Sequence, residues 1–254
     1  MRTATIFLAL TALAPSLSFS ADRPVERKTV AVLAFDNASG RSEYDALGKG
    51  LAAMTITDLS SVEEIRLVER EHLQSLTAEL DLQRTPYFDP ATAARVGRIA
   101  GAEYVVAGAL AALEPRVRID ARVIRVETGE IVKTAQATGS EKRIFEVQEK
   151  LSDELMQGLS VALSPEAAER LRAEREANRV TELHTVLAFS NALDQFDRRD
   201  YAGAAAAMYR VSRAAPGSML VRLTYQRLRA RAAAEAGNRL RNGVNRWLGG
   251  RVPR

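Results

Sequence analysis

The chain has 254 residues, with 36 Lys+Arg against 32 Asp+Glu, a formal net charge of +4 and no cysteine. This length is enough for one sizeable core with an appendage. The lack of cysteine excludes disulfides, thiolate metal sites and cysteine nucleophiles.

The first twenty residues are typical of a secretory signal, which we assign to residues 1–20. Arg2 supplies the basic end, Ile6–Ala14 is an apolar run, and Ser18–Ser20 has the small-x-small pattern of a cleavage site. A membrane anchor is the alternative, but the run is shorter than the ~20 residues that span a bilayer. We therefore expect cleavage and an exported protein.

The next part of the chain alternates between predicted strands and helices. A continuously apolar stretch predicts a strand buried on both faces, and Asp89 before Pro90 is typical of a helix start. A glycine in the short connection 127–130 predicts a hairpin. We expect strands at 29–35, 65–68, 103–111, 116–126 and 131–138, and helices at 44–59, 71–82, from 89 to 101 and at 144–163. This order predicts an α/β fold, with a mixed α+β sheet flanked by helices.

An all-α helical-repeat extension is expected to follow. Residues 167–179 form a charged connector helix, and 182–198 with 201–214 form a helical hairpin. Ala192, Ala204 and Pro216 are spaced by twelve residues, which resembles a single tetratricopeptide-type repeat. Because one repeat rarely stands alone, we expect it to pack on its neighbours or to pair between chains.

The C-terminal end is strongly basic. We expect a capping helix at 218–236 and expect residues 237–254 to be poorly ordered in the free protein. From 215 to 254 there are nine Arg against one Glu, whereas from 21 to 214 there are 26 Lys+Arg against 31 Asp+Glu. Such asymmetry often marks a contact surface. Acidic partners for an exported protein are phospholipid headgroups, lipopolysaccharide or an acidic protein, and not nucleic acid. A solvated, arginine-rich helix face is the alternative.

No motif for catalysis emerges, so we predict no catalytic, cofactor-binding or metal-binding residues, and no enzyme. His72 and His184 are far apart and have no partners at metal-ligand spacing, so we expect satisfied or solvated side chains. The segment Gly48–Gly50 lacks the preceding glycine and the Ser/Thr of a phosphate-binding loop. We therefore expect a helix there.

Several polar residues are weaker candidates for binding. Asp200 is placed to cap the second helix of the hairpin, and Asp194 with Asp197 fits a solvated face. The pairs Asp36–Asn37 and Glu69–Arg70 follow predicted strands, where mixed sheets often present binding loops. Turn chemistry and ion pairing are the alternative roles for these two pairs.

Four of these segments, in this order, carry a resemblance to a known family. They are 29–37, 47–59, 65–70 and 119–132. Together they resemble the periplasmic domain of the curli assembly and transport (CsgG-like) family, over roughly residues 29 to 163. That family overlaps in fold with the N-terminal domain of TolB-like proteins and with lipoprotein activators of peptidoglycan synthases. The resemblance implies a periplasmic or outer-membrane-associated protein without enzymatic activity. The lipidated cysteine usual in such proteins is lacking, which argues against a stable outer-membrane anchor.

A CsgG-like channel inserts two long hairpins per subunit, and each of their strands needs ~9–11 residues to cross the bilayer. The connections 111–116, 126–131 and 83–89 are too short for such hairpins. We therefore predict that the chain does not form the curli-type pore, although it can still form a homo-oligomer.

These inferences divide the chain into a signal peptide (1–20), a CsgG-like domain (21–163), a connector (164–180), a tetratricopeptide-like region (181–236) and a basic tail (237–254). The leading hypothesis is a non-enzymatic periplasmic scaffold or accessory protein in curli-type outer-membrane assembly or secretion. Its partners would be envelope proteins, with peripheral membrane contact through the tail. The alternatives are a regulator that docks on a peptidoglycan synthase, an oligomeric secretion channel component, or an enzyme with an unrecognised site.

Overall fold

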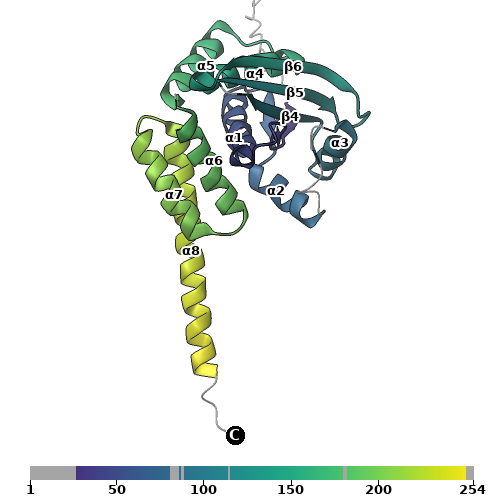
Figure 1. Ribbon diagram of the computed structural model, residues 1–254. Helices are drawn as coiled ribbons and strands as arrows, with labels where there is room; N and C mark the ends of the chain where they lie inside the picture. Colours follow the sequence, from purple (N-terminus) through teal and green to yellow (C-terminus); the bar gives the residue numbers. More distant parts are fainter. Residues whose placement is uncertain (1–26, 81–85, 87–88, 114, 180–181, 250–254) are drawn as a thin grey trace, which may run out of the picture.

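The computed structural model describes residues 27–80, 86, 89–113, 115–179 and 182–249. It shows a mixed sheet flanked by helices, followed by a helical region that ends in one long helix (Figure 1). The predicted fold class is therefore confirmed. The predicted signal peptide lies outside the described residues.

The sheet combines parallel and antiparallel strands. Its order is β3-β1-β4-β5-β6, and β2 pairs with β4 beyond the end of β1. β1, β2, β3 and β4 pair in parallel, and β4, β5 and β6 form antiparallel pairs. The bounds are β1 Lys28–Val32, β2 Asp36–Asn37, β3 Ile65–Leu67, β4 Tyr104–Leu113, β5 Arg116–Arg125 and β6 Ile131–Ser140. The first predicted strand, 29–35, is thus shorter than expected, and pairing resumes at the two polar residues.

The hairpin between β5 and β6 turns as predicted. Gly129 adopts a φ of 73°, a conformation that L side chains rarely adopt. The N–H of Gly129 donates to the carbonyl of Arg125. The N–H of Arg125 donates to the carbonyl of Glu130 at 2.9 Å. The turn therefore needs glycine at this position.

Three helices begin at residues whose side chains cap them. The side chains of Asp89, Ser164 and Asp200 accept hydrogen bonds from the first-turn amides of α3, α5 and α7. The bounds are α1 Leu47–Ser60, α2 Arg70–Glu79, α3 Pro90–Ile99, α4 Ile144–Gly158, α5 Pro165–Asn178, α6 Leu183–Asp197, α7 Tyr201–Ala214 and α8 Met219–Gly249.

Two predicted boundaries at helix C-termini are wrong. α4 ends at Gly158 instead of 163, because Ser160 turns the chain with a φ of 54°. α8 runs through 237–249, which we expected to be poorly ordered. Within 237–249 three Arg and two Leu are strong helix formers, whereas three Gly and three Asn are not. The helix therefore continues from the Ala- and Arg-rich segment before it, and the next proline is Pro253.

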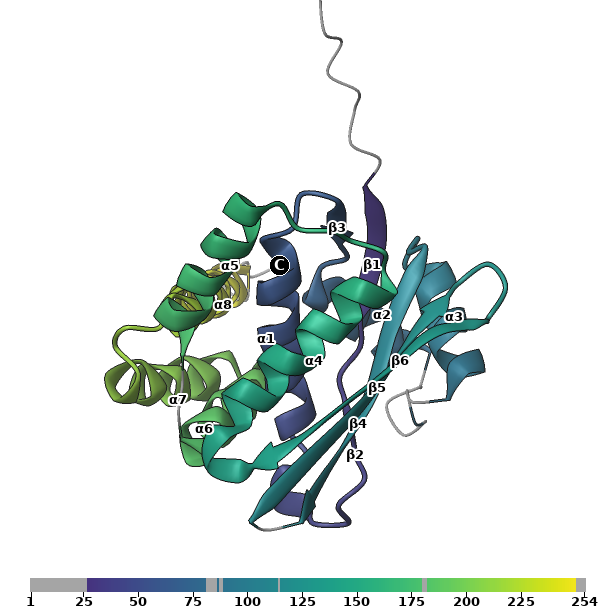
Figure 2. The ribbon, with the colours of Figure 1, turned by 90° about the horizontal axis from the view of Figure 1, so that it is seen from above.

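The sheet buries both faces, and alternate residues of its strands enter different cores. Val30 and Val32 belong to the larger core with α1 and α4, whereas Ala31 and Leu33 belong to the smaller core with α2 and α3. Figure 2 shows α1 and α4 together on one side of the sheet and α3 on the other. Successive side chains of a strand point to opposite faces of the sheet, so β1 contributes alternate residues to the two cores.

The helical region shares the larger core with the sheet. Phe189 of α6 and Met208 of α7 are buried in the same apolar cluster as Leu51 of α1. α6 packs along α7 and against α1, and α7 packs against α8. The expected packing of the helical hairpin on its neighbours is therefore found. The division of the chain at residue 163 stays a prediction.

The connections between strands are short where the structure describes them. β4 ends at Leu113 and β5 begins at Arg116, while β5 and β6 are separated by residues 126–130. Among the described helices, none combines the length and the apolar character that crossing a membrane requires.

Candidate functional site

The junction between α1 and α6 depends on two glycines of α1. A Cβ at Gly48 would lie 1.8 Å from the backbone oxygen of Phe35, and one at Gly50 would lie 2.0 Å from Oγ of Ser190. These glycines therefore serve close packing against the chain after β1 and against α6. The segment Gly48–Gly50 lies in a helix, as expected, and is no phosphate-binding loop.

Lys49, between the two glycines, belongs to a cluster of ion pairs at this junction. Its Nζ lies 2.9 Å from Oδ1 of Asp194 and 2.8 Å from Oδ2 of Asp197. Nη1 of Arg70 donates to both oxygens of Asp197, at 2.9 and 3.1 Å. Arg198 completes the cluster by pairing with Asp194 at 2.9 Å. The cluster thus joins α1 and α2 to the C-terminal turn of α6.

The expectation that Asp194 and Asp197 lie on a solvated face is wrong. The side chain of Asp197 is only 3% exposed and that of Asp194 is 22% exposed, because both face cations of the α/β body. Asp200 does cap α7, as expected. The alternative role for Glu69–Arg70, ion pairing, holds for Arg70.

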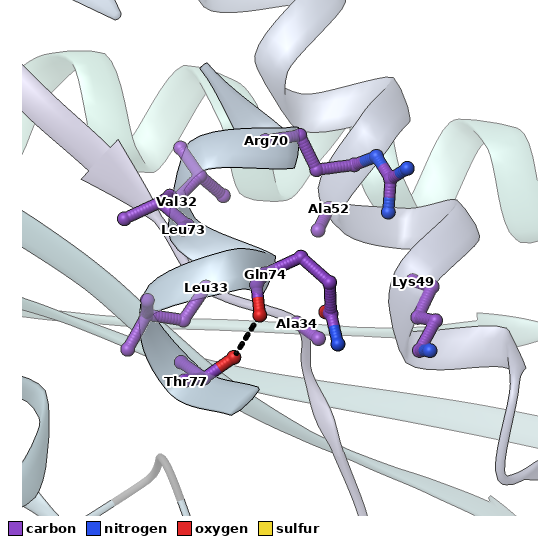
Figure 3. Close-up of a pocket in the computed structure, with 9 residues that line it drawn as sticks. All are labelled: Val32, Leu33, Ala34, Lys49, Ala52, Arg70, Leu73, Gln74 and Thr77. Atoms are coloured by element: carbon purple, nitrogen blue, oxygen red, sulfur yellow. Dashed lines mark hydrogen bonds between the residues drawn. The ribbon is translucent and has the colours of Figure 1, made fainter. Parts of the chain in front are cut away.

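A small cavity lies beside this cluster, between the end of β1, α1 and α2 (Figure 3). Lys49, Arg70 and Gln74 line it, and Oγ1 of Thr77 donates to the carbonyl of Gln74 at 3.1 Å. The cavity measures about 30 Å³, which is room for about one or two water molecules. It is too small for an organic cofactor.

A larger groove opens on the other side of Arg70. It measures about 1010 Å³ and lies between α2, the α6–α7 turn and α8. Apolar and aromatic side chains from several elements line it: Ile56, Leu67, Val68, Phe196 and Tyr201. The rings of Phe196 and Tyr201 meet edge to face at 5.2 Å. The groove is therefore large enough for a segment of another protein.

Charged side chains border this groove. Arg227 of α8 pairs with Glu71 of α2 at 3.2 Å, and Arg231 lies 5.2 Å above the ring of Tyr201. Nη2 of Arg70 is buried and donates no hydrogen bond to any described residue. The exposed guanidinium groups of Arg231 and Arg239, which also line the groove, are therefore the ones available to a ligand that brings acceptor oxygens.

A second set of polar contacts fixes the connector helix α5. Nε of Arg175 donates to Oδ2 of Asp58 in α1 at 3.1 Å, and Nη2 pairs with Asp153 at 2.9 Å. Gln148 of α4 also donates to Asp58. Burial raises the pKa of Asp58 above its ordinary value, and the Arg175 charge and the hydrogen bonds oppose this only in part.

The remaining candidates have structural roles. His72 is exposed on α2, and His184 is exposed at the start of α6 beside Glu182. Within the described residues, no three His, Asp or Glu side chains lie close enough to hold a metal. Asn37 shapes its own turn, since its amide donates to the carbonyl of Arg41 and its oxygen accepts from Ser39.

Sequence reasoning missed the junction because its members are far apart in the chain. Lys49 and Asp194 are separated by 145 residues, and Arg70 and Asp197 by 127. The one local signal is that both aspartates lie on α6 three residues apart, next to the apolar stripe of Phe189 and Leu193. That placement is compatible with an interface as well as with solvent.

Comparison with known proteins supplies one family and several similar proteins. The model of the family described as curli production assembly/transport component CsgG matches residues 15–118. A protein of Rhizobium meliloti (strain 1021) described as putative adenylate cyclase 3 is 28% identical over 192 residues, which are 75% of this chain and 31% of that protein. The chain thus spans about a third of the length of this relative.

Solved structures are similar only at a low level. The LpoB C-terminal domain from Salmonella enterica has 18% identity and a TM-score of 0.39, covering 47% of this chain and 87% of that domain. A PelC dodecamer from Paraburkholderia phytofirmans has 16% identity and a TM-score of 0.36, covering 55% and 91%. TolB from Acinetobacter baumannii has 17% identity and a TM-score of 0.37, covering 53% and 28%.

Structural similarities at this level support no inference about function. The family match covers β1 to β4 and the start of β5, and it includes three of the four segments on which the resemblance was based. A tetratricopeptide repeat is not confirmed. Residues 15–118 of the chain are therefore similar to the CsgG family, in line with the motifs from Thr29 onward.

Proposed function

We propose that this chain is a non-enzymatic periplasmic protein that acts as a scaffold or accessory component in outer-membrane assembly or secretion. Its CsgG-like domain and helical extension would hold a segment of another envelope protein in the groove between them. The single observation that carries this proposal is the groove of about 1010 Å³ at the charged junction, which is lined by aromatic residues and by arginines. The match to the CsgG family supports the envelope context.

The geometry favours binding over catalysis. Lys49 and Arg70 already have carboxylate partners, and the small cavity beside them holds only about 30 Å³. A lining that combines aromatic rings and guanidinium groups is typical of protein interfaces, in which Tyr, Phe and Arg are enriched. The arginines of the border suit a partner segment with carboxylate groups.

Crosslinking in cells tests the groove directly. A photoreactive residue replaces Ser75 or Arg199, which are exposed and line the groove, or Arg210, an exposed residue of α7 outside it. We expect the same partner to crosslink from the two groove positions and not from the control. Arg231→Glu should weaken that crosslink. Equal crosslinking from all three positions would contradict the proposal.

Two further measurements separate the alternatives. Crosslinking of a penicillin-binding protein at the groove positions, and not at the control position, would favour a role as regulator of a peptidoglycan synthase. Single-channel conductance of the purified protein would favour a channel component. The connections around β5 are short, which supports the accessory role.

An enzymatic role can be tested with equal directness. The relative described as a putative adenylate cyclase extends well beyond the part that this chain matches, and we propose no cyclase activity for the chain. Incubation of the purified protein with ATP should give no cyclic AMP. Cyclic AMP formed by the protein and lost with a groove variant would overturn the non-enzymatic proposal.

A further inference from the structure

The C-terminal part of α8 extends away from the rest of the molecule (Figure 1). α8 first packs against α7, where Val221 and Leu228 are buried. From residue 229 to 242 no residue is buried. The stretch 229–249 would be roughly 31 Å long at 1.5 Å per residue. Most of the stability of a helix in a protein comes from packing of its amphipathic face, so a surface that binds this stretch would stabilise it.

Apolar residues recur along this stretch with the period of a helix. Ala233, Ala236, Leu240, Val244 and Trp247 follow one another at spacings of three, four, four and three residues. Such spacing places these positions on one face of an α-helix. Leu240, in the middle of this stripe, is 73% exposed.

The same stretch is strongly basic. Between 229 and 249 there are five arginines and one acidic residue, Glu235, which pairs with Arg239 at 3.3 Å. Arg239 and Arg241 flank Leu240 along the chain, so the helical period places them on either side of the apolar stripe. A basic helix with Trp and Leu on its apolar face is typical of helices that lie on membrane surfaces.

We propose that residues 229–249 of α8 lie on an anionic phospholipid surface, with the stripe from Leu240 to Trp247 against the lipid and the arginines among the phosphate groups. The charge of the stretch argues for lipid and against a second copy of the chain. Pairing of two such helices through the stripe would bring the arginines at 239 and 241 close to those of the partner helix. The first half of the stripe consists of alanines, whose small side chains would provide little apolar contact between two paired helices.

This inference goes beyond the proposed function and develops the expectation from the sequence that the basic tail makes peripheral membrane contact. The contact is made by an ordered amphipathic helix instead of a flexible tail, and the lipid is an anionic phospholipid. The assay needs only the purified protein and lipid vesicles. Its failure would remove the membrane contact and leave capture of a partner in the groove, measured by crosslinking, unaffected.

The test uses Trp247, which is the only tryptophan of the chain. The protein, purified after export, is titrated with phosphatidylglycerol–phosphatidylcholine vesicles or with phosphatidylcholine vesicles alone. We expect a blue shift of the tryptophan emission and flotation with the anionic vesicles only. Both should be reversed by about 0.5 M salt, at which exposed charges are largely screened.

Matched variants test whether vesicle binding depends on α8 itself or only on the net positive charge of the protein. Arg241→Gln with Arg246→Gln should weaken binding about 25-fold, or about fivefold for each arginine. Leu240→Gln should weaken it roughly tenfold by removing an apolar contact. The control, Arg210→Gln with Arg213→Gln, changes net charge equally on exposed positions of α7 and should bind like the parent protein.

Three results would overturn the proposal. The first is absence of a blue shift and of flotation with anionic vesicles at low salt. The second is equal weakening by the α7 control and by the α8 variant. The third is a blue shift without lipid that grows with protein concentration, because that would identify a second copy of the chain as the occupant of the stripe.

Discussion

Removal of the Asp197 carboxylate tests whether the ion-pair cluster holds the helical extension on the α/β body. Asp197 is 3% exposed and pairs with both Lys49 and Arg70. In Asp197→Ala, Lys49 keeps Asp194, whereas Arg70 keeps only Glu71 at 3.9 Å. Breaking a fully buried pair costs about 3–5 kcal/mol. The two cations are 19% and 14% exposed, so we expect a loss of about 2–3 kcal/mol in the free energy of unfolding.

The matched variant is Asp194→Ala at the more exposed end of the same cluster. Asp194 is 22% exposed and one of its partners, Arg198, is 77% exposed, so its removal should cost only about 1 kcal/mol. Urea unfolding followed by far-ultraviolet circular dichroism measures both values. A double-mutant cycle of Asp197→Ala with Arg70→Gln should give a coupling energy of about 1–2 kcal/mol. Equal losses for the two aspartates, or a loss below about 0.5 kcal/mol for Asp197, would refute the reasoning.

Three further changes test the packing, the hairpin and the buried carboxyl. Gly48→Ala should destabilise the protein by about 3 kcal/mol, because its Cβ meets the backbone of Phe35; Gly237→Ala, with no atom nearby, should leave the unfolding midpoint unchanged or higher. Gly129→Ala should cost about 1 kcal/mol because φ is 73°, and Gly217→Ala, in open space, should cost almost nothing. Since the pKa of Asp58 is raised in the folded state, ionisation of this carboxyl opposes folding as pH rises through the raised pKa. The stability of Asp58→Asn relative to the parent should therefore increase as the pH rises above the ordinary pKa of Asp, about 4, until Asp58 is ionised in the folded state, and a difference that stays constant or decreases would contradict this.

Local sequence signals predict the elements that local physics determines. The N-caps at Asp89 and Asp200, the glycine turn at Gly129 and the buried strand β1 all follow from residues within a few positions of one another. The end of α4 was missed because the left-handed Ser160 is a residue type without a strong preference for that conformation. Local chemistry therefore accounts for most of the sheet and its flanking helices.

The site depends on contacts that local patterns do not encode. Asp197 has no feature in its own segment that distinguishes a solvated carboxylate from one that faces Arg70 127 residues away. The extent of α8 was missed for another reason. Gly237, Asn238 and Gly243 suggest a break, but the Ala-rich segment 229–236 before them is already helical, and Arg and Leu residues between them allow the helix to continue.

The shared core and the ion-pair cluster imply that the groove is already formed in the free protein. Phe196 and Tyr201, which line the groove, flank Asp197 in the chain, so a loosened α6–α7 turn would displace them from α2. A preformed groove avoids the cost of ordering these elements when a partner binds. Asp197→Ala should therefore weaken crosslinking of a partner at Ser75 under conditions in which the variant remains folded. Binding of α8 to anionic vesicles should stay as in the parent, because residues 229–249 lie outside the cluster. If both interactions weaken together, the groove and the helix act as one surface, and the separation of partner capture from membrane contact is wrong.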